Sequence, residues 1–359
     1  EKELKNIIAD TLCFEFPVVP VDTDISSLEL YHGPTMAFKD VRARFMARCL
    51  GYFNKDNTNQ VTVLVATSGD TGAAVANGFL GVKDVNVVIL YPSKKVSDIQ
   101  EKQITSLGQN ISALEVQGTF DDCQAMVKNA FLDKDITKKT QLTSANSINV
   151  ARWLPQMFYF FFAYKKLYKT HKDIIFSVPS GNFGNVCAGM MAQQLGLPIK
   201  HFIAANNDNN VVTKYLKTQL YAPVKSVQTI SNAMDVGDPS NFIRIQEIYK
   251  NKFDRLQKNL SSFSFNNTQT RKAMLDIYTK HGYVADPHGA VGYLGCKAYL
   301  EKNTRAHCVF LETAHPTKFL DVVEDVVKTK QALPKQIQTV IANKKVATTI
   351  SNYSDLKAF

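Results

Sequence analysis

The sequence predicts an α/β protein made of two doubly wound α/β lobes. Three observations lead to this fold class: short strands rich in Val and Ile, helical patterns between them, and a second such series farther along the chain. Strands that are apolar nearly throughout are typical of parallel sheets buried on both faces. Alternation of strand and helix is typical of a doubly wound sheet. The simplest arrangement is two lobes that share one cleft.

The first series of elements begins near residue 61. Strands are expected at residues 61–67, 85–92 and 111–116, and helices at residues 72–81 and 98–108. Both helical stretches end at glycine, a common residue just beyond the last turn of a helix. We therefore expect a parallel sheet with helices between its strands in the first lobe.

The second series begins near residue 174. Strands are expected at residues 174–178, 199–205 and 309–311, and helices near residues 185–195, 242–253, 268–281 and 289–300. The aromatic stretch 152–168 is expected to form one long helix that joins the two series. Its phenylalanines are expected to pack in the core, because aromatic side chains dominate core burial.

The composition is that of an ordinary globular protein. Of its 359 residues, 45% are hydrophobic and 21% are charged, and the formal net charge is +10. These values exclude a disordered tail, a collagen-like fibre and a coiled-coil rod. The basic excess is scattered in isolated lysine pairs, so no nucleic-acid partner is expected. It favours small anionic ligands instead.

The cysteine, histidine and hydropathy patterns indicate the compartment of the protein and whether metal or membrane binding is expected. The six cysteines include no C-x-x-C pair, which suggests reduced thiols in an intracellular protein. The histidines form no H-x-x-x-H pair, so no metal is expected. The most apolar run, residues 157–164, is too short to span a bilayer, and the sequence shows no basic-then-apolar signal at its start. We therefore expect a cytoplasmic protein without a membrane partner.

The turn after the first strand is rich in glycine and hydroxyl groups. Residues 66–74 lead from a strand through Ser68, Gly69 and Thr71 into a helix of small residues. The free amides of a first helical turn, together with the helix dipole, can bind an anion. A simple N-cap with a glycine turn is the alternative, and it explains Asp70 or Thr71 taken alone.

The turn at residues 177–185 repeats this design after a strand of the second series. Backbone amides around Gly181 and Gly184 could surround a phosphate dianion, because glycine allows close approach and unusual φ values. The turn matches neither G-x-G-x-x-G nor G-x-x-x-x-G-K-[ST], so dinucleotides and nucleoside triphosphates are not indicated. A polar turn without a ligand is the alternative. Two anion sites suggest ligands with two negative ends.

A third segment, residues 31–40, presents Lys39 after a Gly-Pro turn and the apolar residues 36–38. By base rate a lysine is solvated surface. A lysine presented from an apolar segment can instead lose its proton more readily, as condensation with a carbonyl group requires.

Together these segments resemble the fold-type II pyridoxal-phosphate enzymes related to the tryptophan synthase β chain, and most closely the longer bacterial and fungal branch of the threonine synthase family. The resemblance runs from about Phe14 to Phe319. Six blocks occur in the family's order: residues 32–35 before Lys39, 67–74, 144–149, 180–185, 231–235 and 313–316. It implies the tryptophan synthase β-like fold, with pyridoxal 5'-phosphate in the cleft between the lobes. A large cofactor-binding lobe is expected at residues 1–40 and 166–359, and a smaller, mobile substrate lobe at residues 41–165.

The resemblance also implies roles for single residues in cofactor binding. Lys39 is similar to the family's Schiff-base lysine. Thr313 is similar to the hydroxyl partner of the pyridine nitrogen, where a neutral group tunes the electron sink gently. The cup for the cofactor phosphate is expected at Gly181, Asn182, Phe183, Gly184 and Asn185.

Substrate contacts follow from the same resemblance. The loop that grips the substrate's α-carboxylate is expected at Ser68, Gly69, Asp70 and Thr71. Asn149 and Arg152 lie in the block that we infer lines the substrate phosphate site, where the planar fork of arginine suits a phosphate. A structural ion pair is the alternative for Arg152.

The activity implied is the last step of threonine biosynthesis. O-phospho-L-homoserine and water would give L-threonine and phosphate by γ-elimination and β-hydration, as in a carbon–oxygen lyase. The alternatives are a related phospholyase that degrades O-phospho-amino acids to keto acids, and a non-catalytic binding protein on the same fold. A monomer or weak homodimer is expected. Family members carry several dozen residues before the equivalent of Glu1, so the chain is expected to be truncated at its N-terminus.

Overall fold

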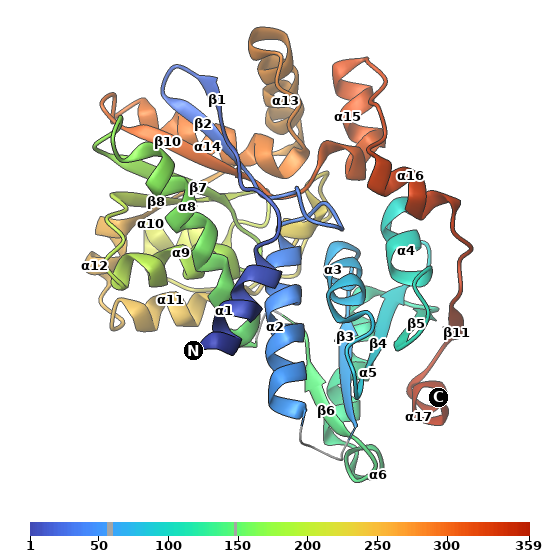
Figure 1. Cartoon of the computed structure of the whole chain (residues 1–359). Helices are drawn as coiled ribbons and strands as arrows, with labels where there is room; N and C mark the ends of the chain where they lie inside the picture. Colours follow the sequence, from blue (N-terminus) through green and yellow to red (C-terminus); the bar gives the residue numbers. More distant parts are fainter. Residues whose placement is uncertain (56–59, 147–148) are drawn as a thin grey trace. The chain divides into compact units, whose positions relative to one another are not determined.

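The computed structural model describes residues 1–55, 60–146 and 149–359. The predicted α/β class is confirmed, because the elements form two sheets of mainly parallel strands with helices between the strands (Figure 1). The chain divides into two compact units. Unit 1 contains residues 1–14, 33–152 and 333–359, and unit 2 contains residues 15–32 and 153–332.

Unit 1 is built on a five-stranded parallel sheet with the order β11-β5-β4-β3-β6. Its strands are β3 (Val61–Ala66), β4 (Val85–Pro92), β5 (Ile111–Val116), β6 (Gln141–Ser144) and β11 (Thr348–Ile350). Its helices are α1 (Lys2–Thr11), α2 (Lys39–Asn54), α3 (Asp70–Phe79), α4 (Asp98–Thr105), α5 (Phe120–Leu132), α6 (Lys134–Thr137), α16 (Lys335–Ala342) and α17 (Tyr353–Ala358). The short helix α7 (Val150–Trp153) spans the end of this unit.

Alternating side chains of β3 show that this sheet is covered on both faces. Val63 and Val65 pack in one cluster with residues of α2 and α3. Leu64 and Ala66 pack in a second cluster with residues of α5 and α17. Successive side chains of a strand point to opposite faces, so the apolar run gives two cores.

Unit 2 contains a six-stranded sheet with the order β1-β2-β10-β7-β8-β9, parallel except for the β1–β2 hairpin. Its strands are β1 (Val18–Asp22), β2 (Ile25–Glu29), β7 (Ile174–Pro179), β8 (His201–Asn206), β9 (Leu260–Ser264) and β10 (His307–Glu312). Its α-helices are α8 (Met157–Leu167), α9 (Gly184–Gln194), α10 (Val211–Thr218), α11 (Phe242–Ile248), α12 (Phe253–Asn259), α13 (Asn267–His281), α14 (Pro287–Leu300) and α15 (Leu320–Val327). Three short 3₁₀ helices are η1 (Leu154–Gln156), η2 (Asn232–Met234) and η3 (Pro316–Phe319).

Two expected helices are broken in the structure. The stretch 152–168 forms α7, η1 and α8 rather than one helix, and Pro155 lies at the break, where its ring removes a backbone donor. The stretch 242–253 ends its first helix at Ile248, because Lys250 and Asn251 adopt positive φ values of 56° and 55°. A left-handed residue cannot continue a right-handed helix.

The division into units differs from the expected lobes at both ends of the chain. Helix α1 packs on α2, so the N-terminal segment lies in unit 1. β11 pairs with β5, and α16 packs against α4, so the last 27 residues also lie there. The whole of α8 falls in unit 2, where this helix packs on α9. Among the described residues, no helix has the length and apolarity needed to cross a membrane.

Candidate active site

Lys39 is the first residue of α2 and is nearly buried, with 9% of its surface exposed. The turn before it is held by Asp40, whose carboxylate accepts hydrogen bonds from the Thr35 amide (2.9 Å) and hydroxyl (2.5 Å). Lys39 Nζ lies 3.4 Å from Asp70 Oδ2. Burial disfavours the charged form of a lysine. This placement therefore fits a functional amine better than a solvated surface lysine.

The turn between β3 and α3 is held by hydrogen bonds to the side chain of Thr67. Thr67 Oγ1 accepts hydrogen bonds from the amides of Gly69 (3.1 Å) and Gly72 (2.7 Å). Gly69 has a φ of 134°, and a Cβ there would lie 2.5 Å from the Gln100 side chain. Two of the turn's amides are therefore taken by Thr67, while Ser68 is exposed to solvent.

The structure places the Asp70 side chain toward Lys39. One carboxylate oxygen pairs with Lys39, and the other accepts a hydrogen bond of 3.0 Å from Gln100 Nε2. A carboxylate repels another carboxylate, so the side chain of Asp70 is unsuited to grip the substrate's α-carboxylate. Gln100 had no signal in the sequence, because 30 residues separate it from Asp70.

The side chain of Arg152 is fully buried. The expected contact with the substrate's phosphate requires such burial only once the substrate is bound. Burial, and then the neighbouring charge of Arg42, hold the pKa of the Arg152 guanidinium well below its ordinary value. Arg42 itself donates a hydrogen bond of 3.1 Å to Thr71 Oγ1. Two neighbouring buried cations favour an anion beside them. Arg42 was not anticipated from the sequence, although its position three residues after Lys39 puts both on one face of α2.

Asn149 is half-buried, and its side chain serves the local turn. Asn149 Nδ2 donates to the Ser144 carbonyl oxygen (3.2 Å), and Asn149 Oδ1 accepts from the Ala151 amide (3.0 Å). These contacts cap the start of α7. Two residues of the same block, Ser147 and Ile148, lie outside the described residues.

In unit 2 the predicted phosphate cup, residues 181–185, follows β7 and opens α9. Phe183 adopts a left-handed conformation (φ 61°), and among the described residues no side chain caps the helix. A Cβ on Gly181 would lie 2.6 Å from Met234 Cα and 3.0 Å from the Ala233 carbonyl oxygen, so the turn is backed directly by the backbone of these two residues of the block 231–235. That family block thus forms the wall behind the cup. Its Ala233 amide in turn donates to His288 Nε2 (3.2 Å).

Two asparagines of the cup differ in their contacts. Asn182 Oδ1 accepts hydrogen bonds from the amide (2.7 Å) and hydroxyl (2.9 Å) of Ser240. Asn185 Oδ1 accepts from the Tyr159 hydroxyl at 2.5 Å, while Asn185 Nδ2 is buried and has no hydrogen-bond partner among the described residues. An unpaired buried donor at an uncapped helix N-terminus fits the phosphate of pyridoxal phosphate.

Thr313 lies at the same sheet edge as the cup. β10 and β7 are parallel neighbours with Phe310 opposite Ser177, so both chains leave the sheet side by side. Thr313 itself is 7% exposed. The preceding Glu312 is fully buried, and burial, followed by the charge of Asp286, raises its pKa well above the ordinary value. This buried carboxyl group, adjacent to Thr313 in the chain, was not anticipated from the sequence.

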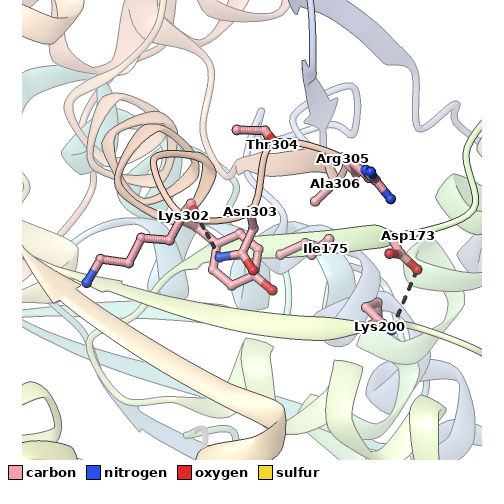
Figure 2. Close-up of a pocket in the computed structure, with 9 residues that line it drawn as sticks. Asp173, Ile175, Lys200, Lys302, Asn303, Thr304, Arg305 and Ala306 are labelled. Atoms are coloured by element: carbon pink, nitrogen blue, oxygen red, sulfur yellow. Dashed lines mark hydrogen bonds and ion pairs between the residues drawn. The ribbon is translucent and has the colours of Figure 1, made fainter.

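A hollow of about 270 Å³ lies at the opposite edge of this sheet, where β7, β8 and β10 begin (Figure 2). Lys200 faces Asp173 there at 3.7 Å, and Lys302 and Arg305 follow the C-terminus of α14. Cations at that position stabilise the helix dipole. The charges of the hollow are thus accounted for by the fold.

Comparisons with known proteins agree with this geometry. The model of the pyridoxal-phosphate dependent enzyme family matches residues 24–313, and that of the threonine synthase C-terminal domain matches residues 289–359. Threonine synthase of Buchnera aphidicola subsp. Baizongia pistaciae is 44% identical over 99% of this chain and 83% of its own length. Threonine synthase of Escherichia coli K12 is 43% identical over 93% of this chain and 77% of its own length.

Solved structures give the same result. The crystal structure of Escherichia coli threonine synthase has a TM-score of 0.92 and 41% identity, covering 99% of this chain and 82% of its own. Threonine synthase of Brucella melitensis with pyridoxal phosphate bound has a TM-score of 0.92 and 32% identity, covering 99% and 83%. The fold, the lysine at the start of α2 and the cup after β7 therefore have one explanation: the chain belongs to the threonine synthase family of pyridoxal-phosphate-dependent enzymes.

Proposed function

We propose that this chain binds pyridoxal phosphate through Lys39 and converts O-phospho-L-homoserine and water into L-threonine and phosphate. The observation that supports the proposal most strongly is the phosphate cup. There α9 has no side-chain cap, and the side-chain nitrogen Asn185 Nδ2 has no hydrogen-bond partner among the described residues, so both can bind an anion. Bound there, pyridoxal phosphate supplies an electron sink for the charge that develops at the substrate's α- and β-carbons.

Two parts of unit 2 would hold the cofactor. Residues 181–185 would bind its phosphate with backbone amides and with the side chain of Asn185. Thr313 would contact the pyridine nitrogen as a neutral hydroxyl. A Cβ on Gly184 would make only ordinary van der Waals contact with the protein, the nearest atom being Asn241 Nδ2 at 3.4 Å, so the fold itself does not require glycine there.

Lys39 would act as the general base and general acid of the reaction. Its Nζ must be neutral to remove the substrate's α-proton, and it must then hold that proton until another carbon or oxygen receives it. Asp70, at 3.4 Å from Nζ, stabilises the protonated form of the amine. We infer that Asp70 serves Lys39 with its side chain and can serve the substrate only with its backbone amide.

The substrate's two negative ends would be bound by unit 1. For the α-carboxylate we propose Ser68 together with the amides of Asp70 and Thr71, while Gly69 provides the turn. For the phosphate we propose Arg152 and its neighbour Arg42, which is already fixed by Thr71. Asn149 would support this site by shaping the turn before α7.

The cysteines and the charge distribution bear on the cellular setting and the partners of the enzyme. The six cysteines are free thiols, which suits a cytoplasmic enzyme. The scattered basic charge supports the absence of a nucleic-acid partner. We propose a monomer or weak homodimer, with unit 2 as the larger cofactor-binding lobe and unit 1 as the mobile substrate lobe.

The test is an absorbance spectrum of the purified protein before and after O-phosphohomoserine is added, with phosphate and threonine assayed in the same tube. A yellow protein whose spectrum shifts while both products accumulate supports the proposal. O-phosphothreonine is offered in parallel, and keto acid with ammonia as the only products would identify a phospholyase. A colourless protein that pyridoxal phosphate cannot restore would favour the non-catalytic alternative. Lys39→Ala should abolish turnover, and near-normal activity would remove Lys39 from its role.

A further inference from the structure

Tyr159 on α8 contacts Asn185, the last residue of the proposed phosphate cup. Helices α8 and α9 lie side by side in unit 2 (Figure 1). The Tyr159 ring is completely buried and packs against Phe16 and Phe160, with ring centroids 6.1 and 5.1 Å away. Its hydroxyl lies 2.5 Å from Asn185 Oδ1 and 3.1 Å from Gln156 Oε1. The ring is therefore held by packing, while the hydroxyl is directed at the amide of Asn185.

The contact with Tyr159 determines which end of the Asn185 amide is free. The oxygen and nitrogen of an amide lie on opposite sides of one planar group, so binding of Oδ1 turns Nδ2 the other way. Nδ2 is buried and has no partner among the described residues. A buried unpaired donor is destabilising, because it has lost its water without gaining another partner. Such a cost is maintained where a ligand uses the donor.

The orientation has an electrostatic consequence. With Nδ2 directed away from Tyr159, Asn185 offers a donor from the first turn of an uncapped helix, where an anion is favoured. With the amide reversed, the carbonyl oxygen would take that place and would repel a phosphate dianion. The Tyr159 hydroxyl has one proton and two acceptors within reach, Asn185 Oδ1 at 2.5 Å and Gln156 Oε1 at 3.1 Å. Donation to the nearer acceptor, Oδ1, favours the first of these two states.

We propose that Tyr159 is a positioning residue for the cofactor phosphate: its hydroxyl fixes the Asn185 amide so that Nδ2 donates to the phosphate group. The inference rests on the proposed function, since it concerns the cofactor of that reaction. It assigns a binding role to one hydroxyl of the aromatic stretch that the sequence indicates as core packing.

The test compares Tyr159→Phe with the unsubstituted protein in equilibrium titrations of the cofactor-free chain. Pyridoxal phosphate and pyridoxal, which lacks the phosphate, are used as separate probes. We expect Tyr159→Phe to weaken pyridoxal phosphate about tenfold and to leave pyridoxal unchanged, because only the phosphate contact is lost. Equal weakening of both probes would show a packing defect and would overturn the proposal. Tyr164→Phe on the same helix is the matched control, since its ring stacks on Tyr168 instead.

A double-mutant cycle with Asn185→Ala provides a second, independent measurement. If Tyr159 acts through Asn185, adding Tyr159→Phe to Asn185→Ala causes no further loss of pyridoxal phosphate affinity. Additive losses would overturn the proposal even if both variants fold normally. Failure of the unsubstituted chain to bind pyridoxal phosphate would instead refute the proposed function, so the two failures are distinguishable.

Discussion

The turn after β3 and the turn after β7 have the same plan, a parallel strand followed by a glycine-rich turn and a helix, yet they differ in where their donors go. After β3, Thr67 Oγ1 accepts hydrogen bonds from the amides of Gly69 and Gly72, so these two donors are satisfied internally. After β7, no side chain among the described residues caps α9, and Asn185 Nδ2 has no hydrogen-bond partner there. A glycine-rich turn can thus bind a ligand only through the donors that the chain itself does not use.

The largest effect expected from this comparison is at Gly69. Gly69→Ala should destabilise unit 1 by about 4 kcal/mol, because it combines a φ of 134° with a clash against Gln100. Urea unfolding of the cofactor-free protein measures the loss. Gly108→Ala is the matched control: its φ is 65°, no described atom lies within 4 Å of the added Cβ, and it should cost only about 1 kcal/mol. Equal costs would show that crowding at Gly69 does not matter.

The closed turn can be opened by removing its acceptor. Thr67→Val should lower the free energy of unfolding by about 3 kcal/mol, because two buried amides lose their partner. Thr67→Ser keeps the hydroxyl and should retain most of the stability. Both are measured by urea unfolding. A valine variant as stable as the serine variant would mean that the turn is not held by this hydroxyl.

The two units should also differ in their response to acid. All seven histidines lie in unit 2. Burial, and then the charge of His171, lower the pKa of His307 to about 4. The unfolded chain therefore binds more protons than the folded chain between pH 6.5 and 4, and stability falls as the pH falls through this window.

We expect His307→Gln to reduce this acid-induced loss by roughly 2 kcal/mol, since glutamine does not titrate. Hydrogen exchange of the cofactor-free protein, corrected for the intrinsic pH dependence, reports the two units separately. Unit 2 should lose protection at a higher pH than unit 1, which serves as the internal control. Simultaneous loss in both units of the unsubstituted protein would contradict the assignment to histidine.

The smallest change in stability is expected in the open turn. Gly184→Ala meets its first protein atom at 3.4 Å, so the cofactor-free protein should be as stable or more stable by about 0.5 kcal/mol. Its affinity for pyridoxal phosphate should nevertheless fall about tenfold, because we expect the added methyl group to clash with the bound phosphate. Titration and urea unfolding of the same sample separate the effects. Unchanged affinity would place the phosphate elsewhere.

The fold class, the order of most elements and the six family blocks followed from the sequence itself. β4 and β5 have the predicted bounds, because an apolar run buried on both faces is a local signal. The turn at residues 177–185 is also a local signal, since a glycine-rich turn between a strand and a helix is contained in ten residues; its role as a phosphate cup stays a prediction. Local periodicity and composition were sufficient wherever one short segment carries the whole signal.

Tertiary structure alone decided the features that depend on distant partners. β2 contains two serines and is buried throughout, because Ser26 lies 3.0 Å from His307 Nε2 and Ser27 lies 2.9 Å from the Tyr283 hydroxyl. The pairing of Asp70 with Lys39 and the contact of Tyr159 with Asn185 are likewise absent from any local pattern. The physical reason is that a polar group's role is set by the partner that satisfies it, and that partner is chosen by the fold.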